Sequence, residues 1–299
     1  MQRDSTASTA RRSARESDEG PFGRIAIVGF GLIGASIGLA ARRRWPSAEL
    51  VAVDRAEVIQ SAMRTHAADI GGADLALCEN ADLVILAAPV QTNIRLLSEL
   101  VRYVPGNAVV TDVGSTKRQI ASVGGQLPSR LPFVGGHPLA GAATGGLEAA
   151  RSDLFAGRAW ILTPVEHHQA AVEKLSIFID GLGANVRVMT PDAHDSVVAY
   201  LSHLPQLTAT ALMHLVGERT GVDGLALAGR GLQDTTRLAS SPPDIWRDIS
   251  ATNHDHIARA IDELVDLLLR MKDGGNTLGE TFESAARWKQ VLEAGKVKV

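Results

Sequence analysis

Gly29-Phe-Gly31-Leu-Ile-Gly34 is the stretch of this 299-residue sequence that decides the fold. The strand-like run Arg24–Val28 precedes it, a helix-like run over Leu32–Arg44 follows it, and a second strand-like run over Glu49–Val53 ends at Asp54. In this context the three glycines predict the strand, turn and helix of a dinucleotide-binding Rossmann domain. The alternative is a tight turn between strand and helix that binds no ligand.

The acid that ends the second run indicates which dinucleotide is bound. Asp54 stands twenty residues after Gly34, where a carboxylate accepts hydrogen bonds from the adenosine ribose hydroxyls. The same charge repels the 2′-phosphate of NADP, so the sequence predicts NAD, although Arg55 leaves the preference incomplete. We expect the cofactor contacts to come from Gly29, Gly31, Leu32, Ile33, Gly34, Asp54, Arg55, Ala88, Pro89, Asp112 and Gly114.

Short apolar runs alternate with helical stretches from Arg24 to about Val188. This rhythm predicts an α/β fold with a doubly wound parallel sheet, and the carboxyl ends of such strands line the ligand crevice. After Thr190-Pro191, long helical patterns replace the strands, and Pro205 is expected to kink the first of them. The predicted divisions are a disordered tail over 1–20, a dinucleotide-binding domain over 21–189 and an all-helical domain over 190–299.

The composition excludes several classes of function. A net charge of −3 and a hydrophobic content of 45% are typical of a globular protein, without the basic surplus of a nucleic-acid-binding chain. No apolar stretch reaches the ~20 residues that cross a membrane. The single Cys78 excludes an internal disulfide and agrees with a cytoplasmic location. We therefore expect a small-molecule substrate, no nucleic acid and no membrane.

Two polar segments follow predicted strands at the ligand edge of the sheet. Asp112-Val-Gly-Ser115-Thr-Lys117 offers a hydroxyl beside the cofactor, with capping of the next helix by Ser115 or Thr116 as the alternative. Gly135-Gly-His137-Pro offers a ring nitrogen that can accept a proton, because histidine is largely neutral at pH 7. A loop histidine satisfied by the backbone is the alternative.

The helical domain supplies fewer polar candidates. His203, in Ser202-His203-Leu-Pro-Gln206, follows His194-Asp195, but this spacing is not that of a helical zinc pair, so we expect no metal. Arg247, in Trp246-Arg247-Asp, presents a fork of donors that suits a carboxylate. Taken singly, Arg247 agrees better with a surface ion pair than with a ligand contact.

Six blocks, GFGLIGASIG, DVGSTK, GGHPLAG, HDxxxAxLSHLP, GRGLQDTTRLA and PDIWRDI, resemble in order and spacing the prephenate/arogenate (cyclohexadienyl) dehydrogenase family of tyrosine biosynthesis. The resemblance runs from Phe22 onward. It implies NAD-dependent oxidative decarboxylation of prephenate by an enzyme that dimerises through its helical domain. It also implies that His137 accepts or polarises the hydroxyl proton, that Ser115 orients the hydroxyl, that Arg247 binds a carboxylate and that His203 lines the pocket.

One departure from the family leaves the substrate open. Many members carry a second histidine where this chain has Gln206, and an amide cannot become charged. Prephenate, arogenate and an amino-substituted prephenate all remain candidates, with Gln206 expected at the substrate. We expect neither a regulatory ACT-type domain nor a fused chorismate mutase segment.

Two other classes of function remain as alternatives. A β-hydroxyacid dehydrogenase or imine reductase shares the Rossmann-then-helical order but places a lysine or aspartate where this chain offers His203. A dinucleotide sensor without turnover would need the glycine loop, but it would not need Ser115, His137 and Arg247.

Overall fold

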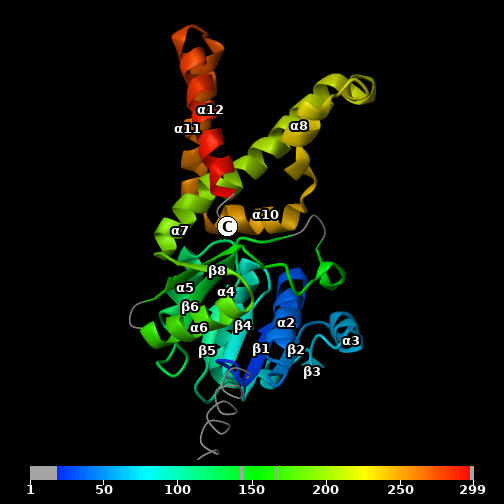
Figure 1. Cartoon of the computed structure of the whole chain (residues 1–299), viewed down its shortest axis with the longest axis vertical. Helices are drawn as coiled ribbons and strands as arrows, with labels where there is room; N and C mark the ends of the chain where they lie inside the picture. The colour runs from blue at the N-terminus through cyan, green and yellow to red at the C-terminus, as the bar shows by residue number, and fades with distance from the viewer. Residues whose placement is uncertain (1–18, 142–144, 166–167, 297–299) are drawn as a thin grey trace, which may run out of the picture. The chain divides into compact units, whose positions relative to one another are not determined.

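The computed structural model describes residues 19–141, 145–165 and 168–296 (Figure 1). The predicted disordered tail over 1–20 lies almost entirely outside the described residues. The chain forms two compact units. The first extends to Asp195 and includes Pro243–Thr252, and the second consists of Ser196–Pro242 and the residues from Asn253 onward. The helix over Pro243–Thr252 therefore belongs to the first unit, where it contacts the helix over Val90–Tyr103, although the sequence pattern alone groups it with the second domain.

An eight-stranded sheet forms the centre of the first unit, in the order β3-β2-β1-β4-β5-β6-β7-β8. The predicted α/β sheet is confirmed, with one difference: β7 runs antiparallel to β6. Parallel neighbours need a long crossover, usually a helix, whereas the described residues between β6 and β7 include only a short 3₁₀ turn, η2 over Leu147–Ala149. The strands are β1 Arg24–Val28, β2 Glu49–Val53, β3 Ile70–Gly72, β4 Leu83–Leu86, β5 Val109–Asp112, β6 Phe133–Pro138, β7 Ala159–Pro164 and β8 Asn185–Val188.

Helices cover both faces of this sheet and create two apolar cores. Alternate residues of β1 divide between the cores, since Ile25 and Ile27 belong to one and Ala26 and Val28 to the other. A fully buried isoleucine or leucine contributes about 1.5–3 kcal/mol, so the alternation fixes the register of the strand. The helices and turns of this unit are α2 Leu32–Arg44, α3 Ala56–Arg64, η1 Leu75–Cys78, α4 Val90–Tyr103, α5 Arg118–Gly124, α6 Gln169–Gly181, α7 Pro191–Val198 and α10 Pro243–Thr252, of which α7 continues into the second unit.

The second unit is helical in its described part, as expected. The distortion expected at Pro205 takes the form of a π-helical turn, η3 over Ala199–His203, because proline lacks the N–H that the carbonyl of Leu201 would otherwise receive. In Figure 1, α11 and α12 lie side by side, and the two helices are in contact. The remaining elements are α8 Leu204–Leu225, α9 Arg230–Thr235, η4 Arg237–Ser240, α11 His254–Lys272 and α12 Asn276–Lys296.

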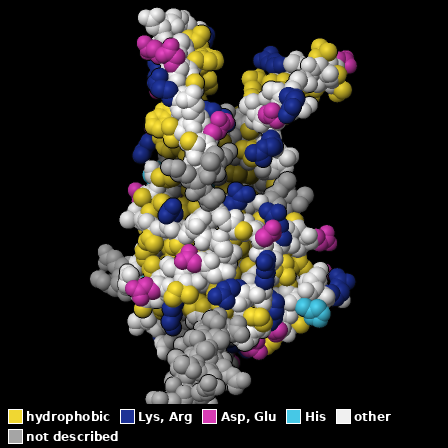
Figure 2. All heavy atoms as spheres, in the orientation of Figure 1, with side chains coloured by type: hydrophobic (Ala, Val, Ile, Leu, Met, Phe, Trp, Pro, Cys, Tyr) yellow, Lys and Arg dark blue, Asp and Glu magenta, His cyan; other side chains and the backbone are white. Residues whose placement is uncertain are grey.

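Large apolar side chains of the second unit are exposed (Figure 2). Val222 is 84% exposed on α8, and Trp288 is 70% exposed on α12. Exposed large apolar side chains gathered on a few helices are typical of a surface that binds another macromolecule. No described helix is both long enough and apolar enough to cross a membrane. Other exposed apolar residues on these helices are Leu215, Val265, Leu268, Leu269, Phe282, Val291 and Leu292.

Candidate active site

The glycine loop between β1 and α2 has the shape that a dinucleotide needs. Gly29 adopts φ +95°, and a Cβ there would lie 2.6 Å from the backbone of Ala87. A Cβ on Gly34 would lie 2.0 Å from the carbonyl oxygen of Gly29, so only glycine lets helix and strand approach this closely. Nothing lies within 4 Å of a Cβ built on Gly31, which leaves room for a ligand beside the loop.

The surroundings of the loop suit the charges of NAD. The first turn of α2 contains no acidic residue, so its N–H groups present a positive end to a pyrophosphate. Asp54 follows β2, and its carboxylate accepts hydrogen bonds from the backbone N–H of Phe30 at 2.6 Å and of Arg55 at 2.7 Å. Those bonds fix the carboxylate while leaving acceptor capacity for ribose hydroxyls. Arg55 is 84% exposed and 3.9 Å from Asp54.

Four further cofactor candidates lie at the ends of β4 and β5. Ala88 is half-buried with its N–H bonded to Asn93, and Pro89 is exposed. Gly114 is buried, and its N–H donates to Asp112. The carboxylate of Asp112 is fully buried, and it also accepts hydrogen bonds from Lys117 and from the N–H of Gly136. This arrangement favours a structural role for Asp112, in contrast to the cofactor contact expected from the sequence.

Lys117 and Asp112 form a buried ion pair that ties β5 to β6. The Nζ of Lys117 also donates to the carbonyl of Gly136 at 2.7 Å. Burial lowers the pKa of Lys117, and the adjacent Asp112 opposes that effect. Because Gly136 is clamped through both its N–H and its carbonyl, the backbone that leads into His137 is fixed.

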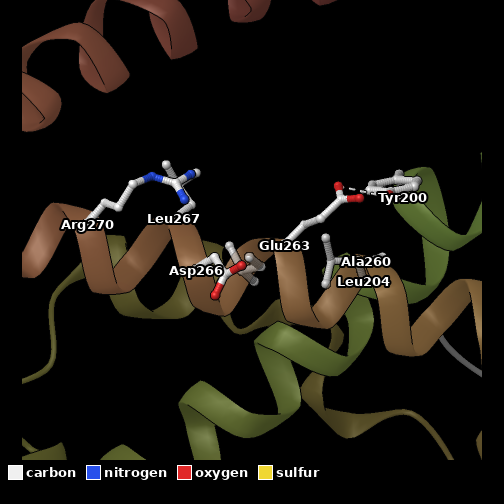
Figure 3. A pocket seen from close by; sticks show the side chains of 8 residues that line it. Tyr200, Leu204, Ala260, Glu263, Asp266, Leu267 and Arg270 are labelled. Atoms are coloured by element: carbon white, nitrogen blue, oxygen red, sulfur yellow. Dashed lines mark hydrogen bonds between the residues drawn. The ribbon is translucent and has the colours of Figure 1, made fainter.

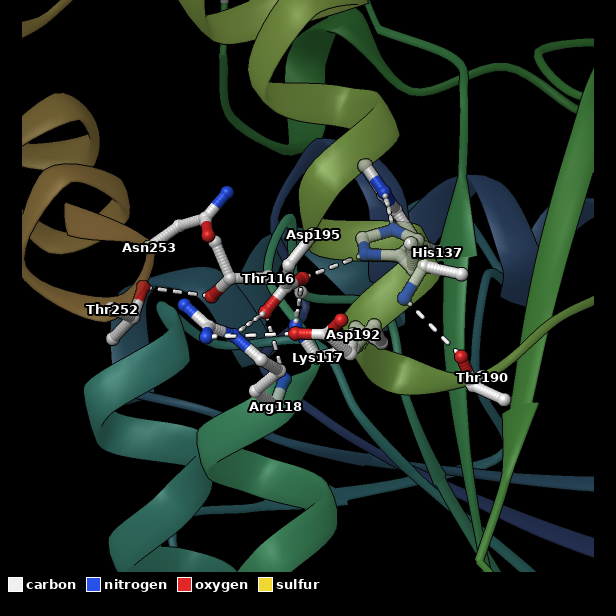
Figure 4. Close-up of polar contacts among 12 residues, drawn as sticks. Thr116, Lys117, Arg118, His137, Thr190, Asp192, Asp195, Thr252 and Asn253 are labelled. Carbon is white, nitrogen blue, oxygen red and sulfur yellow. Dashed lines mark hydrogen bonds and ion pairs between the residues drawn. The ribbon is translucent and has the colours of Figure 1, made fainter. Parts of the chain in front are cut away.

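The segment before α5 is organised by an acid from another helix. Asp195, on α7, accepts hydrogen bonds from the N–H of Lys117 at 2.7 Å and of Arg118 at 2.9 Å (Figure 4). The hydroxyl of Thr116 instead lies 2.7 Å from that of Thr252 on α10. No side chain of the loop itself caps α5, so the alternative of capping by Ser115 or Thr116 is wrong. Ser115 is half-buried in this loop.

His137 is the penultimate residue of β6 and not a loop residue beyond it. It is buried, with 8% of its surface exposed. Its Nδ1 lies 2.8 Å from Nε2 of His194, and Nδ1 of His194 lies 2.8 Å from Oδ1 of Asp195. A continuous line of hydrogen bonds thus runs from His137 at the sheet edge through His194 to Asp195. The alternative in which His137 is satisfied only by the backbone is wrong.

The electrostatics of this line favour a neutral histidine beside an ionised acid. Burial is the largest influence on His194 and lowers its pKa, as does Lys117, while Asp195 opposes them. Burial alone would raise the pKa of Asp195. Hydrogen bonds from His194 and from the N–H groups of Arg118 and Lys117 instead hold that pKa below its usual range.

Helix α10 brings Arg247 to the first unit. Asp248 accepts a hydrogen bond from the N–H of Gln91, at the start of α4, at 3.1 Å. This contact and the one between Thr116 and Thr252 attach α10 to the start of α4 and to the loop after β5. Arg247 itself is exposed and pairs with Asp244 at 2.6 Å, which is the surface ion pair that the sequence left open.

The other two predicted substrate residues belong to the second unit. His203 ends η3 and is buried, with Nδ1 3.4 Å from the amide nitrogen of Asn253. Gln206 donates to the carbonyl of Leu238 at 2.7 Å and accepts from the hydroxyl of Ser241 at 3.1 Å. Both ends of this amide are therefore occupied within the unit, which favours a structural role for Gln206 around η4.

A cavity of about 400 Å³ lies in the second unit (Figure 3). Tyr200 donates a hydrogen bond to Glu263 at its rim, and Arg270 stands at the other end. Neither His203 nor Gln206 lines it, so it is separate from the predicted substrate residues. Its lining is Tyr200, Leu204, Ala260, Glu263, Leu264, Asp266, Leu267 and Arg270.

Sequence reasoning missed the part that His194 and Asp195 play. It weighed these residues only as metal ligands, and the described residues include no group of three or more histidine, cysteine or acidic side chains that could hold a metal. The sequence does contain a signal that could have placed His194 and Asp195 at the start of a helix. Thr190-Pro191 begins α7, with the hydroxyl of Thr190 accepting from the N–H of Ala193 at 3.2 Å, and this start places both polar side chains in the first turns.

Comparison with known proteins identifies the family. A family model described as prephenate dehydrogenase, nucleotide-binding domain matches residues 37–188, and one described as prephenate dehydrogenase, dimerization domain matches residues 190–274. A prephenate dehydrogenase of Bacillus subtilis is 36% identical over 252 residues, which cover 81% of this chain and 67% of the relative.

Two solved structures are also similar over most of their length. A prephenate dehydrogenase from Aquifex aeolicus, in complex with hydroxyphenyl propionate and NAD+, is 29% identical with a TM-score of 0.80, covering 92% of this chain and 97% of that one. An arogenate dehydrogenase from Synechocystis is 29% identical with a TM-score of 0.73, covering 92% and 99%. The predicted resemblance is therefore confirmed, and the chain belongs to the prephenate dehydrogenase family.

Proposed function

We propose that this chain is an NAD-dependent dehydrogenase that converts prephenate to 4-hydroxyphenylpyruvate with loss of CO2. The observation that carries the proposal is the position of His137, which lies at the same sheet edge as the glycine loop and is oriented by His194. The match to both prephenate dehydrogenase domains and the similarity to the Bacillus subtilis enzyme support it.

The residues of the glycine loop hold the cofactor in this proposal. Gly29, Gly31 and Gly34 form the turn over which the pyrophosphate lies, and Asp54 accepts the ribose hydroxyls. Bound NAD supplies the acceptor for the hydride that leaves the carbinol carbon. The carboxylate of Asp54 disfavours the 2′-phosphate of NADP at this position.

His137 then provides the chemistry that the substrate needs. Its ring takes the proton of the carbinol hydroxyl as the C–H bond breaks and the carbonyl develops. The electrons of the bond between the ring and its carboxylate pass through the ring to the carbonyl oxygen, and CO2 leaves. The protonated His137 then returns its proton to that oxygen, and aromatisation drives the reaction. Ser115, in the loop after β5, hydrogen-bonds the same hydroxyl, and Arg247 binds a substrate carboxylate after exchanging its partner Asp244.

The second unit serves assembly and substrate contact. A second copy of this chain covers its exposed apolar helices, as the match to a dimerization domain over residues 190–274 suggests. We keep His203 as the candidate substrate residue of this unit. Gln206 supports η4 through its bonds to Leu238 and Ser241, and we assign it no direct contact with the substrate. We also propose a cytoplasmic location, in keeping with the single free cysteine.

Arogenate is the second candidate substrate, because the Synechocystis relative is named an arogenate dehydrogenase. The test is NADH formation by the purified full chain with prephenate, arogenate or an amino-substituted prephenate, each with NAD and with NADP. We expect the largest kcat/KM with prephenate and NAD. A larger kcat/KM with arogenate would correct the substrate, whereas no reduced cofactor with any of them would overturn the proposed reaction.

A further inference from the structure

We infer that His194 and Asp195 are positioning residues that fix which ring nitrogen of His137 carries its proton. The inference concerns side chains that lie behind the reacting group, on α7, and it rests on the proposed function only for its effect on turnover. All three residues belong to the first unit, as do their contacts.

The carboxylate of Asp195 decides which ring nitrogen of His194 carries a proton. An ionised carboxylate accepts hydrogen bonds and donates none. Because Oδ1 of Asp195 lies 2.8 Å from Nδ1 of His194, that nitrogen must carry a proton and donate it. Burial lowers the pKa of His194, so the ring is neutral and its other nitrogen, Nε2, has a lone pair.

His194 in turn decides which ring nitrogen of His137 carries a proton. Nε2 of His194 is an acceptor, and Nδ1 of His137 lies 2.8 Å from it. Nδ1 of His137 therefore donates, and in the neutral ring the remaining nitrogen, Nε2, has the lone pair. That is the tautomer that a general base requires at Nε2, and it is selected before any substrate binds.

Asp195 also stabilises the positive charge that His137 acquires during the reaction. When His137 accepts the hydroxyl proton at Nε2, it becomes an imidazolium whose Nδ1–H points to His194. The negative charge of Asp195 stabilises that cation through the intervening neutral ring, and no proton needs to leave either histidine. The charged groups that act on His194 are Asp195 from α7, Lys117 before α5 and Asp112 from β5, and Arg118 pairs with Asp195.

The backbone supports the same geometry. Asp195 is itself held by the N–H groups of Lys117 and Arg118, at 2.7 and 2.9 Å. The backbone before His137 is held by the pair of Asp112 and Lys117 through Gly136. Both ends of the line are thus anchored to the loop between β5 and α5, which keeps the rings from rotating.

The direct test is nitrogen-15 NMR of the wild-type chain labelled at the ring nitrogens of its nine histidines. Signals that disappear in His137→Asn and in His194→Gln assign the two rings. We expect both neutral rings to be protonated at Nδ1 at pH 7.5. A His137 ring protonated at Nε2 would overturn the inference, and this readout does not depend on which substrate is turned over.

A pair of variants tests the consequence for turnover. His194→Leu removes both hydrogen bonds, so we expect kcat with prephenate to fall about a hundredfold and the acid limb of the kcat profile to move to lower pH. His194→Gln can still donate to Asp195 and accept from His137, so it should retain kcat within about tenfold of wild type. Phe178→Leu, in the core beside Trp45, is the control for lost stability and should leave the pH profile unchanged.

The outcomes separate the inference from the proposed reaction. A His194→Leu enzyme with the wild-type kcat and pH profile would overturn the inference, as would equal losses in the Leu and Gln variants. If the wild-type chain oxidises no cyclohexadienyl substrate, the proposed reaction fails, while the NMR result still decides the tautomer. If His194→Leu does not fold, the inference is decided by the protonated ring nitrogen of His137 in the NMR spectrum and by whether His194→Gln retains kcat.

Discussion

The two units of this chain differ in the kind of side chain that distinguishes them, hydrogen-bonded polar groups in the first and exposed apolar groups in the second. In the first unit, buried polar groups at the sheet edge bond one another, as His137 does with His194 and Asp112 with Lys117. In the second, Val222 and Trp288 expose 84% and 70% of their surfaces. The first unit therefore brings buried polar groups together within one chain, whereas the described helices of the second leave large apolar side chains uncovered.

Replacing the proposed base, His137, tests the polar network of the first unit and should have the largest effect on turnover. We expect His137→Asn to lower kcat by roughly a hundredfold or more, as loss of a general base does, with little change in NAD affinity. Steady-state kinetics and a fluorescence titration with NAD measure the two quantities. His66→Asn is a matched control, because His66 is exposed and its positive φ of 53° suits asparagine. Wild-type turnover in His137→Asn would remove His137 from the mechanism.

A charge introduced on the exposed apolar helices of the second unit tests whether they form the dimer interface. Trp288→Glu places a carboxylate where we expect a second copy to pack, so the dimer dissociation constant should rise about a hundredfold, since a buried unpaired charge costs several kcal/mol. Sedimentation equilibrium measures this change. Lys289→Gln, on the exposed polar side of the same helix, should leave association unchanged. An unaltered dimer in Trp288→Glu would exclude that face of α12 from the interface.

The exposed arginine of α10 should show an intermediate effect. Arg247→Gln is expected to raise the substrate KM about tenfold with a smaller change in kcat, because a charge-assisted hydrogen bond contributes about 1.5–3 kcal/mol to binding. The control is Asp244→Asn, which removes only the partner seen in the structure. If both variants raise KM equally, the ion pair and not the contact with substrate explains the effect.

The pH dependence of stability should be the smallest effect and should come from the first unit. The pKa of His194 is lowered by burial, so the unfolded chain binds a proton that the folded one does not as the pH falls below about 6.5. The lowered pKa of Asp195 acts in the same direction near pH 4 and below. We therefore expect Tm to fall by a few degrees between pH 7.5 and pH 5, with a flatter slope in His194→Gln. A Tm that rises on acidification would contradict these directions.

Local patterns made the central parts of the fold predictable. β1, α2 and β2 lie at the predicted residues because alternating burial and the glycine turn are properties of neighbouring residues. The antiparallel β7 was not predicted, since its direction depends on the connection and not on its own sequence. The contact of Asp195 with the N–H of Lys117 joins residues 78 positions apart, and no periodicity encodes such a pair.

The candidate site was predictable residue by residue but not in its connections. His137 could be chosen because it follows an apolar run at the ligand edge, yet its place within β6 and its partner His194 required the fold. Gln206 looked like a substrate ligand in sequence, whereas its amide is occupied by Leu238 and Ser241. The role of a side chain that could serve either structure or binding depends on its neighbours in space. The sequence alone does not show which residues those neighbours are.

The stoichiometry of the reaction tests the central claim most directly. Prephenate labelled with carbon-13 in its ring carboxylate allows CO2 and NADH to be counted in the same reaction with the purified chain and NAD. We expect one CO2 for each NADH, with both rates falling together in His137→Asn, because hydride removal and proton removal from the hydroxyl precede loss of the carboxylate. NADH without labelled CO2, or no NADH at all, would contradict oxidative decarboxylation.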